Sequence, residues 1–170
     1  MRPPMRTSTI TVRAVGPDDF EAVADLTARA YVDGGHLSAD DGYVRKLRDV
    51  ADRARRAELL VAVEGDRVLG SVTLARGEGD YANIARRGEM EFRMLAVAPE
   101  ASGRGVGRAL VQAVVDRARV EGHERIVLTS QASMTVAHGL YERFGFRRTP
   151  DRDWEPEPGL HLMAYVLDLG

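Results

Sequence analysis

The 170-residue sequence predicts a single mixed α/β domain built around one central β-sheet. Two observations carry this prediction. Segments with the alternation typical of strands recur along the whole chain, and segments with apolar residues at helical spacing lie between them. The composition is that of a globular protein, with 44% hydrophobic and 29% charged residues, and the chain is long enough for one substantial core.

The first elements are expected to be a strand and two helices. Residues 9–15 alternate and contain β-branched side chains, which predicts a strand after a loose tail over residues 1–8. Pro17 followed by two acids marks a helix start, and the apolar residues beyond it lie on one helix face. After a loop over residues 33–42, residues 43–56 predict a second helix, whose many charges we assign to a solvated face.

A hairpin and a polar connection follow. Residues 59–63 and 68–75 predict two strands, and the Glu-Gly-Asp-Arg sequence between them contains a hairpin turn signal. Residues 77–88 are polar and lack either periodicity, so they are expected to connect this hairpin to the next strand.

The most informative stretch is a strand, a glycine-rich turn and a helix. Residues 89–98 read as a strand that ends before Pro99, because proline cannot donate a ladder hydrogen bond. Gly103, Gly105 and Gly107 then occupy every second position, and an amphipathic helix with one apolar stripe comes directly after them.

The last third of the chain alternates strands with one helix. A short apolar run predicts a buried strand, and a later helix is stopped by a glycine of the kind that caps helix ends. The expected elements are a strand over residues 125–130, a helix over 135–144 ended by Gly145, a strand over 146–149, a long turn over 150–159 and a last strand over 160–169.

Charge and composition argue against several classes of function. The net charge of −2 and the pI of about 6.1 do not favour nucleic acid or an anionic membrane as a partner. No cysteine is present, which removes disulfides, thiolate metal sites and a cysteine nucleophile, and the four histidines show no metal-ligand spacing. With neither a signal peptide nor a membrane-spanning run in the sequence, a cytoplasmic location is expected.

The glycine-rich turn has the features of a phosphate site. Glycines allow close approach of a ligand to the backbone, and the first turn of the helix presents unpaired N–H groups at the positive end of the helix dipole. Arg104 and Arg108 flank the turn and can add charge-assisted bonds. The alternative is a helix that merely follows a flexible loop. The turn has neither the glycine spacing of a dinucleotide fingerprint nor the Gly-Lys-Ser/Thr of a P-loop.

Two motifs give this stretch a family resemblance. The Ser-Gly-Arg-Gly-Val-Gly sequence from Ser102 is similar to the Gln/Arg-x-x-Gly-x-Gly/Ala signature of the GNAT superfamily of acyl-CoA-dependent N-acyltransferases. Residues 137–146, Ala-His-Gly-Leu-Tyr-Glu-Arg-Phe-Gly-Phe, are similar to that family's Ala-x-x-x-Tyr-x-x-x-Gly-Phe block. Ser102 replaces the usual Gln or Arg, and Met134 stands where many members have Asn, two departures that leave the backbone amides of the turn unaffected.

The resemblance implies a GNAT domain over residues 9–170, with about seven strands, about four helices, and a fourth and a fifth strand that splay apart. It implies acetyl-CoA as co-substrate and no metal, with the pantetheine arm in the gap between those strands. The amide of Val97 would donate to the thioester carbonyl. Carried over by position, the cofactor-binding residues are Leu95, Ala96, Val97, Ser102, Gly103, Arg104, Gly105, Val106, Gly107 and Arg108.

The resemblance also suggests two catalytic residues. Tyr141 matches the family tyrosine that can protonate the CoA sulfur; the alternative is a core aromatic, because Leu140 and Phe144 lie beside it. Glu91 lies where some members carry a carboxylate base. Strand alternation would place Glu89, Glu91, Arg93, Leu95 and Val97 on one face, so a plain ion-pair cluster is the alternative for Glu91.

The function these observations predict is N-acetyltransfer from acetyl-CoA to a primary amine by direct attack, without a covalent acyl-enzyme. The acceptor would be a small-molecule amine or a peptide amine. One alternative is a non-catalytic acyl-CoA-binding or sensing domain of the same fold, and another is transfer of a different acyl group. Family members are often dimers, so a homodimer is an open alternative to a monomer.

Overall fold

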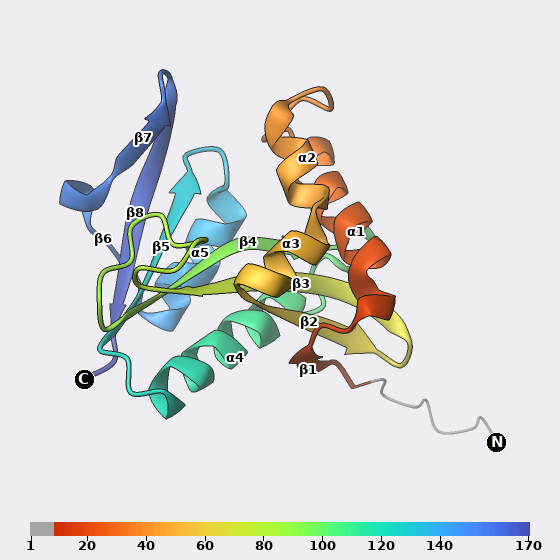
Figure 1. Cartoon of the computed structure of the whole chain (residues 1–170), viewed down its shortest axis with the longest axis horizontal. Helices are drawn as coiled ribbons and strands as arrows, with labels where there is room; N and C mark the ends of the chain where they lie inside the picture. The colour runs from red at the N-terminus through yellow and green to blue at the C-terminus, as the bar shows by residue number, and fades with distance from the viewer. Residues whose placement is uncertain (1–8) are drawn as a thin grey trace.

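The computed structural model describes residues 9–170, so the tail expected for residues 1–8 lies outside the described residues. This part of the chain forms one mixed sheet of eight strands with five α-helices (Figure 1). The strands are β1 (Thr11–Ala14), β2 (Glu58–Glu64), β3 (Arg67–Arg76), β4 (Glu89–Val97), β5 (Arg125–Gln131), β6 (Arg147–Arg148), β7 (Trp154–Glu157) and β8 (Leu160–Asp168). The helices are α1 (Phe20–Asp33), α2 (Gly42–Arg48), α3 (Val50–Arg56), α4 (Val106–Val120) and α5 (Thr135–Phe144), with 3₁₀ turns at Pro17–Asp19, Pro99–Ala101 and Pro150–Arg152.

The strand order confirms the predicted mixed α/β class. The sheet runs β1-β2-β3-β4-β5-β8-β6, and β7 pairs with β8 off this path. All of these pairs are antiparallel except β4 with β5. A parallel pair needs a crossover connection, and α4 provides it.

The fourth and fifth strands separate, as the family resemblance implied. Only Glu89–Glu91 of β4 pair with β5, and their partners are the first three residues of that strand. Beyond Glu91, β4 continues to Val97 without pairing to β5, whereas β5 pairs with β8 along its whole length. The carboxyl ends of both strands therefore leave an open edge between them, with α5 beside it (Figure 1).

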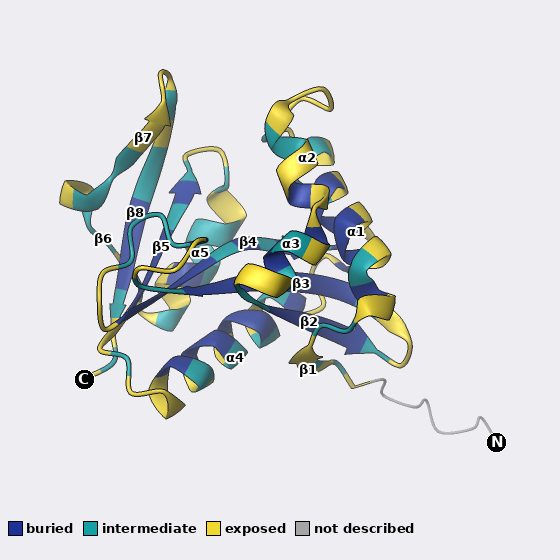
Figure 2. Cartoon of the chain, viewed as in Figure 1, coloured by how far each residue is buried: buried dark blue, intermediate teal, exposed yellow. Residues whose placement is uncertain are grey.

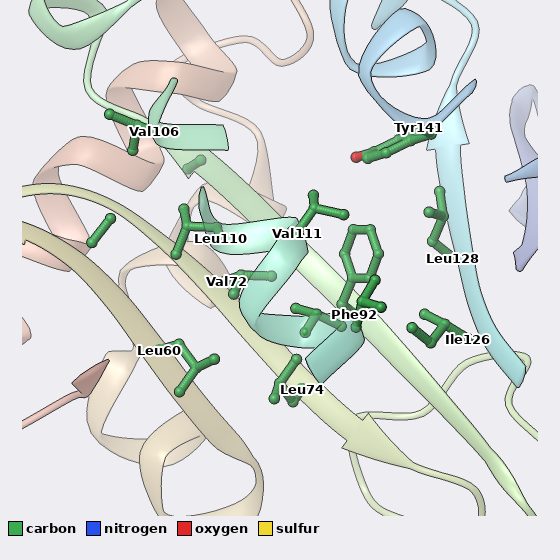
Figure 3. Close-up of a cluster of buried hydrophobic side chains, with 14 of the residues drawn as sticks. Leu60, Val72, Leu74, Phe92, Val106, Leu110, Val111, Ile126, Leu128 and Tyr141 are labelled. Carbon is green, nitrogen blue, oxygen red and sulfur yellow. The ribbon is translucent and has the colours of Figure 1, made fainter. Parts of the chain in front are cut away.

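The main core lies between α4 and the sheet. The inward face of α4 is completely buried, which confirms its predicted apolar stripe. It packs against side chains from β2, β3 and β4 (Figure 3). Figure 2 shows α1 and α3 covering the opposite face of the sheet, where Val23 and Val50 meet the other alternate residues of β2. No helix within residues 9–170 combines the length and apolar character needed to cross a lipid bilayer.

The helix predicted over residues 43–56 is in fact two helices, α2 and α3, with a break at Asp49. Arg53 explains the break. Its guanidinium turns back and donates to the carbonyl of Leu47 at 2.8 Å, which satisfies the end of α2. Arg53 is only 1% exposed, so assigning every charge of this segment to a solvated face was wrong.

The long turn predicted over residues 150–159 also contains regular structure. Residues 154–157 form β7, which pairs antiparallel with the start of β8 through a turn that includes Gly159 at φ 85°. Pro156 is compatible with this strand because β7 is an edge strand that pairs only with β8, so a residue without a backbone N–H can lie there. By contrast, Gly145 ends α5 in the left-handed conformation, with φ 96°, as predicted.

Candidate active site

A cleft of about 1160 Å³ opens where β4 and β5 separate. Five segments far apart in the sequence line it: the end of α1 with the loop after it, the end of β4, the glycine-rich turn with α4, α5 with the loop before it, and Leu167 near the end of β8. Of the ten residues predicted to bind a cofactor, nine line this cleft, and Arg104 is the exception.

The glycine-rich turn needs its glycines for two different reasons. Gly103 and Gly105 have φ 80°, a left-handed conformation that side chains disfavour, and a Cβ at either would meet open space. Gly107 instead allows α4 to approach α5, because a Cβ there would lie 3.2 Å from the Leu140 side chain. Substituents at this turn would therefore strain the backbone or push the two helices apart.

The first turn of α4 offers unpaired donors to the cleft. The first hydrogen bond of α4 runs from the Ala109 N–H to the Gly105 carbonyl at 3.0 Å. The N–H groups of residues 106–108 precede it and have no acceptor within the helix. Residues 106–108 all line the cleft. This end of a 15-residue helix can bind a negatively charged group such as phosphate.

The two arginines of the turn differ in availability. Arg104 lies outside the cleft and is paired with Glu64. Arg108 lines the cleft and, among the described residues, has no carboxylate within ion-pair distance. Sequence reasoning missed Arg119 and Arg143, which also line the cleft. Helical spacing could have indicated Arg119, because residues 108, 112, 115 and 119 lie on one face of α4 and Arg108 was predicted to bind the cofactor.

The end of β4 presents a free backbone edge to the cleft. Successive N–H groups of a strand point to opposite edges, and the Ala98 N–H donates to the Leu69 carbonyl on the β3 side at 2.8 Å. The Val97 N–H therefore points to the β5 side, where the strands have separated. Leu95 and Val97 line the cleft with it.

A β-bulge at Met94 corrects the predicted facing of β4. Arg93 pairs with Thr73 and Val97 pairs with Gly70, so β4 carries one extra residue over this span. Met94 has φ 54° at this point. The extra residue reverses the alternation, so Arg93 and Val97 face opposite sides and the single face predicted from Glu89 to Val97 is wrong.

Tyr141 is buried within an aromatic cluster and, like Glu91, is not among the residues that line the cleft. It is 5% exposed, and its ring centroid lies 5.6 Å from Phe92 and 6.0 Å from Tyr165. Burial raises the pKa of its hydroxyl, so the phenol is protonated at neutral pH. Figure 3 shows the hydroxyl directed away from α5. Burial also raises the pKa of the Tyr31 hydroxyl, which belongs to a residue that lines the cleft.

Glu91 is fully buried and does not line the cleft. Its Oε1 accepts three consecutive backbone N–H groups, from Asn83, Ile84 and Ala85, each at 2.9 Å. Its Oε2 is buried and has no partner among the described residues. Burial raises the pKa of this carboxyl, against the lowering effect of the three N–H groups.

The ion-pair cluster considered for the β4 face does not form as a unit. Glu89 pairs with Arg152 at 2.8 Å, and the guanidinium of Arg152 also donates to the Ile84 carbonyl. Arg93 instead donates to the Tyr81 carbonyl and to the Tyr43 hydroxyl. Together with Glu91, these contacts fasten the connection over residues 77–88 to the sheet.

One further contact crosses the mouth of the cleft. Nδ1 of His36 lies 2.8 Å from Oγ of Ser133, and both residues line the cleft. They join the loop after α1 to the loop before α5, 97 residues apart. Neither residue has a sequence pattern that would have revealed this pairing. Within residues 9–170, no cluster of three or more His, Asp or Glu side chains has an arrangement that could hold a metal ion.

Comparison with known proteins gives consistent relatives. The profile described as the acetyltransferase (GNAT) family matches residues 20–146. Mycothiol acetyltransferases of Cellulomonas flavigena and Geodermatophilus obscurus are 32% and 33% identical to the chain over 146 and 141 residues. These alignments cover 82% and 80% of the chain but 41% and 44% of the relatives, so the chain spans less than half of their length.

Solved structures show the same fold. A GNAT-family acetyltransferase from Staphylococcus aureus Mu50 superimposes with a TM-score of 0.76 at 14% identity, over 95% of this chain and 100% of that one. A GNAT-family acetyltransferase from Brucella melitensis, in complex with acetyl-CoA, superimposes with a TM-score of 0.66 at 23% identity, over 96% of this chain and 90% of that one.

Proposed function

Because the chain belongs to the GNAT acetyltransferase family, we propose that it transfers the acetyl group of acetyl-CoA to a primary amine by direct attack. One observation supports this most strongly. The unpaired N–H groups at the start of α4 and the free edge of β4 meet in one cleft. A phosphate-binding end and a strand edge, side by side, suit a long cofactor with a pyrophosphate and an amide-containing arm.

The cofactor would be held mainly by backbone. The turn from Gly103 to Arg108 would hold the pyrophosphate through its N–H groups, with the Arg108 guanidinium adding charge, and Ser102 would lie beside it. Leu95, Ala96 and Val97 would hold the pantetheine arm along the open strand edge. When bound, acetyl-CoA supplies an acyl thioester. The Val97 N–H would donate to the thioester carbonyl oxygen as that oxygen gains negative charge.

Tyr141 would protonate the departing thiolate. Its raised pKa keeps the proton on the phenol at neutral pH, so the group is in the correct state for a general acid. Tyr141 can both pack in the core and donate a proton. Its ring makes the aromatic contacts, and its hydroxyl lies at the far end of the ring.

We assign Glu91 to the construction of the site. Its Oε1 already accepts three backbone N–H groups, which hold the carboxyl in place. These contacts support a role in holding residues 83–85 against β4. The alternative, a base that acts on the amine through water, predicts that Glu91→Gln abolishes transfer while leaving acetyl-CoA binding and this loop intact.

The test of cofactor binding uses two glycines at the two ends of α4. Gly105 and Gly122 have φ 80° and 77°, and a Cβ at either would meet open space. Gly105→Val and Gly122→Val therefore impose similar backbone strain, but only Gly105 lines the cleft. We expect calorimetry to show acetyl-CoA binding weakened more than tenfold by Gly105→Val and unchanged by Gly122→Val. Equal effects of the two substitutions would contradict a cofactor site at this turn.

Turnover separates an enzyme from a non-catalytic acyl-CoA-binding domain. Release of free CoA thiol is measured with acetyl-CoA and a panel of primary amines. We expect amine-dependent thiol release. Saturable binding of acetyl-CoA without release for any amine would favour the binding or sensing domain, and release with a longer acyl-CoA alone would favour another acyl group.

A further inference from the structure

Resting on the proposed transferase function, we propose that the acceptor amine also carries a carboxylate, and that Arg93 and Lys46 bind this carboxylate. The two cations lie between α2, β4 and the connection over residues 77–88, on the face that carries α2 and α3 (Figure 1). They form what we call the acceptor cation pair.

The acceptor cation pair is held in place by groups that do not neutralise it. The Arg93 guanidinium donates to the Tyr81 carbonyl at 3.0 Å and to the Tyr43 hydroxyl at 3.2 Å. Nζ of Lys46 lies 5.6 Å from the ring centroid of Tyr81 and 6.0 Å from that of Tyr43. Carbonyl, hydroxyl and aromatic faces orient a cation without cancelling its charge.

The nearby carboxylates are already engaged elsewhere. Asp52 accepts the Tyr81 hydroxyl at 2.7 Å and pairs with Arg55 and Arg56 at 2.9 and 3.0 Å. The carboxyl of Glu91 is occupied by backbone N–H groups, as described above. Within residues 9–170, no carboxylate comes within 4.0 Å of Arg93 or Lys46. Elsewhere on the sheet, Arg76, Arg117, Arg125 and Arg148 all have carboxylate partners.

A third cation adds to the positive potential. Arg53 is 1% exposed and is satisfied by the carbonyl of Leu47 and the sulfur of Met94, while its Nε is buried without a partner. A guanidinium stays charged even when burial lowers its pKa. Burial and the charges of Arg93 and Arg53 together lower the pKa of Lys46, which opposes the effect of Asp52. An anionic ligand would relieve this repulsion.

Neither cation of the acceptor cation pair lines the cleft, so the inference requires an acceptor that extends from Arg93 to the end of β4. Arg93 lies two residues before Leu95, roughly 7 Å along the strand. The bulge at Met94 turns Arg93 to the face opposite Val97, so the cation lies across the strand from the cofactor turn. Burial raises the pKa of Tyr31, which lines the cleft, and the positive charges of Arg93 and Arg53 oppose this rise. The same positive potential would favour the neutral form of an acceptor amine, which is the form that attacks.

The experiment compares matched acceptors with acetyl-CoA. L-alanine, L-leucine, L-phenylalanine, L-lysine and L-aspartate are each measured against the corresponding carboxamide, and a tripeptide against its C-terminal amide. We expect kcat/KM to be at least about tenfold higher for the acids, as for a charge-assisted hydrogen bond. If the acid is preferred over the carboxamide only in the amino acid pairs, the acceptor is a free amino acid. If the acid is preferred only in the tripeptide pair, the acceptor is a peptide.

Substitutions then locate the preference. Arg93→Gln keeps donors for the Tyr81 carbonyl and should lower kcat/KM for the acids about tenfold to a hundredfold, with less than about a twofold effect on the amides. Lys46→Gln should also lower kcat/KM for the acids, and because Lys46 is exposed we expect this variant to fold. Arg45→Gln is the matched control, because it removes an exposed cation from the same helix without touching the pair.

Three results would overturn this inference, and they are distinguishable. Amides acetylated as fast as acids would refute the carboxylate and leave the transferase function standing. An acid preference that survives both Arg93→Gln and Lys46→Gln would refute the assignment of these residues. Absence of thiol release with every acceptor, despite acetyl-CoA binding, would remove the proposed function and the inference together.

Discussion

Replacing Glu91 with leucine should destabilise the protein by about 3 kcal/mol, because three backbone donors would lose their shared acceptor. A buried donor left without a partner costs about 1–3 kcal/mol. Residues 83–85 are partly buried, so water can replace part of each bond and the lower end applies to all three. For a domain of this size, a loss of about 3 kcal/mol lowers Tm by about 6–12 °C.

Glu91→Gln is the matched control. Its amide oxygen can accept the same three N–H groups in nearly the same volume, so we expect stability within about 1 kcal/mol of wild type. Denaturant unfolding measures the free energy, and hydrogen exchange at residues 83–85 should accelerate in Glu91→Leu alone. A free energy of unfolding for Glu91→Leu within about 1 kcal/mol of wild type, with unchanged hydrogen exchange at residues 83–85, would contradict this role of Glu91. Loss of transfer in Glu91→Gln, with the loop intact, would restore the base hypothesis.

Three further outcomes are expected. Tyr141→Phe should lower kcat about a hundredfold while leaving the Kd for acetyl-CoA within about twofold in calorimetry, because the substitution removes only the hydroxyl that would donate the proton. An unchanged kcat would assign Tyr141 to the core alone. The bonds from Arg148 hold the pKa of Asp153 well below its usual range, so their contribution to stability is present above the unfolded pKa of about 3.9 and is lost as pH falls through the folded pKa. Acid titrations should therefore show wild type losing more stability than Asp153→Asn, and equal losses would contradict this. Arg152→Leu should cost up to about 3 kcal/mol in denaturant unfolding, because the buried carboxylate of Glu89 loses its partner at 2.8 Å and keeps, among the described residues, only Arg125, at 3.6 Å, as an ion-pair partner. Adding Glu89→Gln should recover part of this loss, and no recovery would mean that the loss comes from packing.

Local patterns were enough to predict most of the fold. Alternation and turn signals located the hairpin of β2 and β3, and apolar spacing located α4 and α5. These signals are short-range, since each depends on the few residues that one element contains. The glycine-rich turn could be located in the same way, because its conformation is set by Gly103 and Gly105 themselves. Contributions of Tyr141 and Val97 to catalysis stay predictions from resemblance.

The errors of sequence reasoning arose where a particular side-chain or strand contact, which periodicity does not encode, decided the outcome. Residues 43–56 have the periodicity of one helix, but a turned-back Arg53 makes two. Residues 150–159 contain three of the seven prolines, yet residues 154–157 form a strand because they pair with β8. In β4, strict alternation predicted one face, and the bulge at Met94 made two.

The chain's own residues therefore determined which elements form and where a phosphate-binding turn can lie. Only the tertiary structure decided that Glu91 is buried in a ring of backbone donors, that Arg104 is paired while Arg108 is available, and that Arg93 keeps an uncancelled charge. The physical reason is that a charged side chain's role depends on burial and on its partners, which come from other elements. Propensity and periodicity carry no information about such partners.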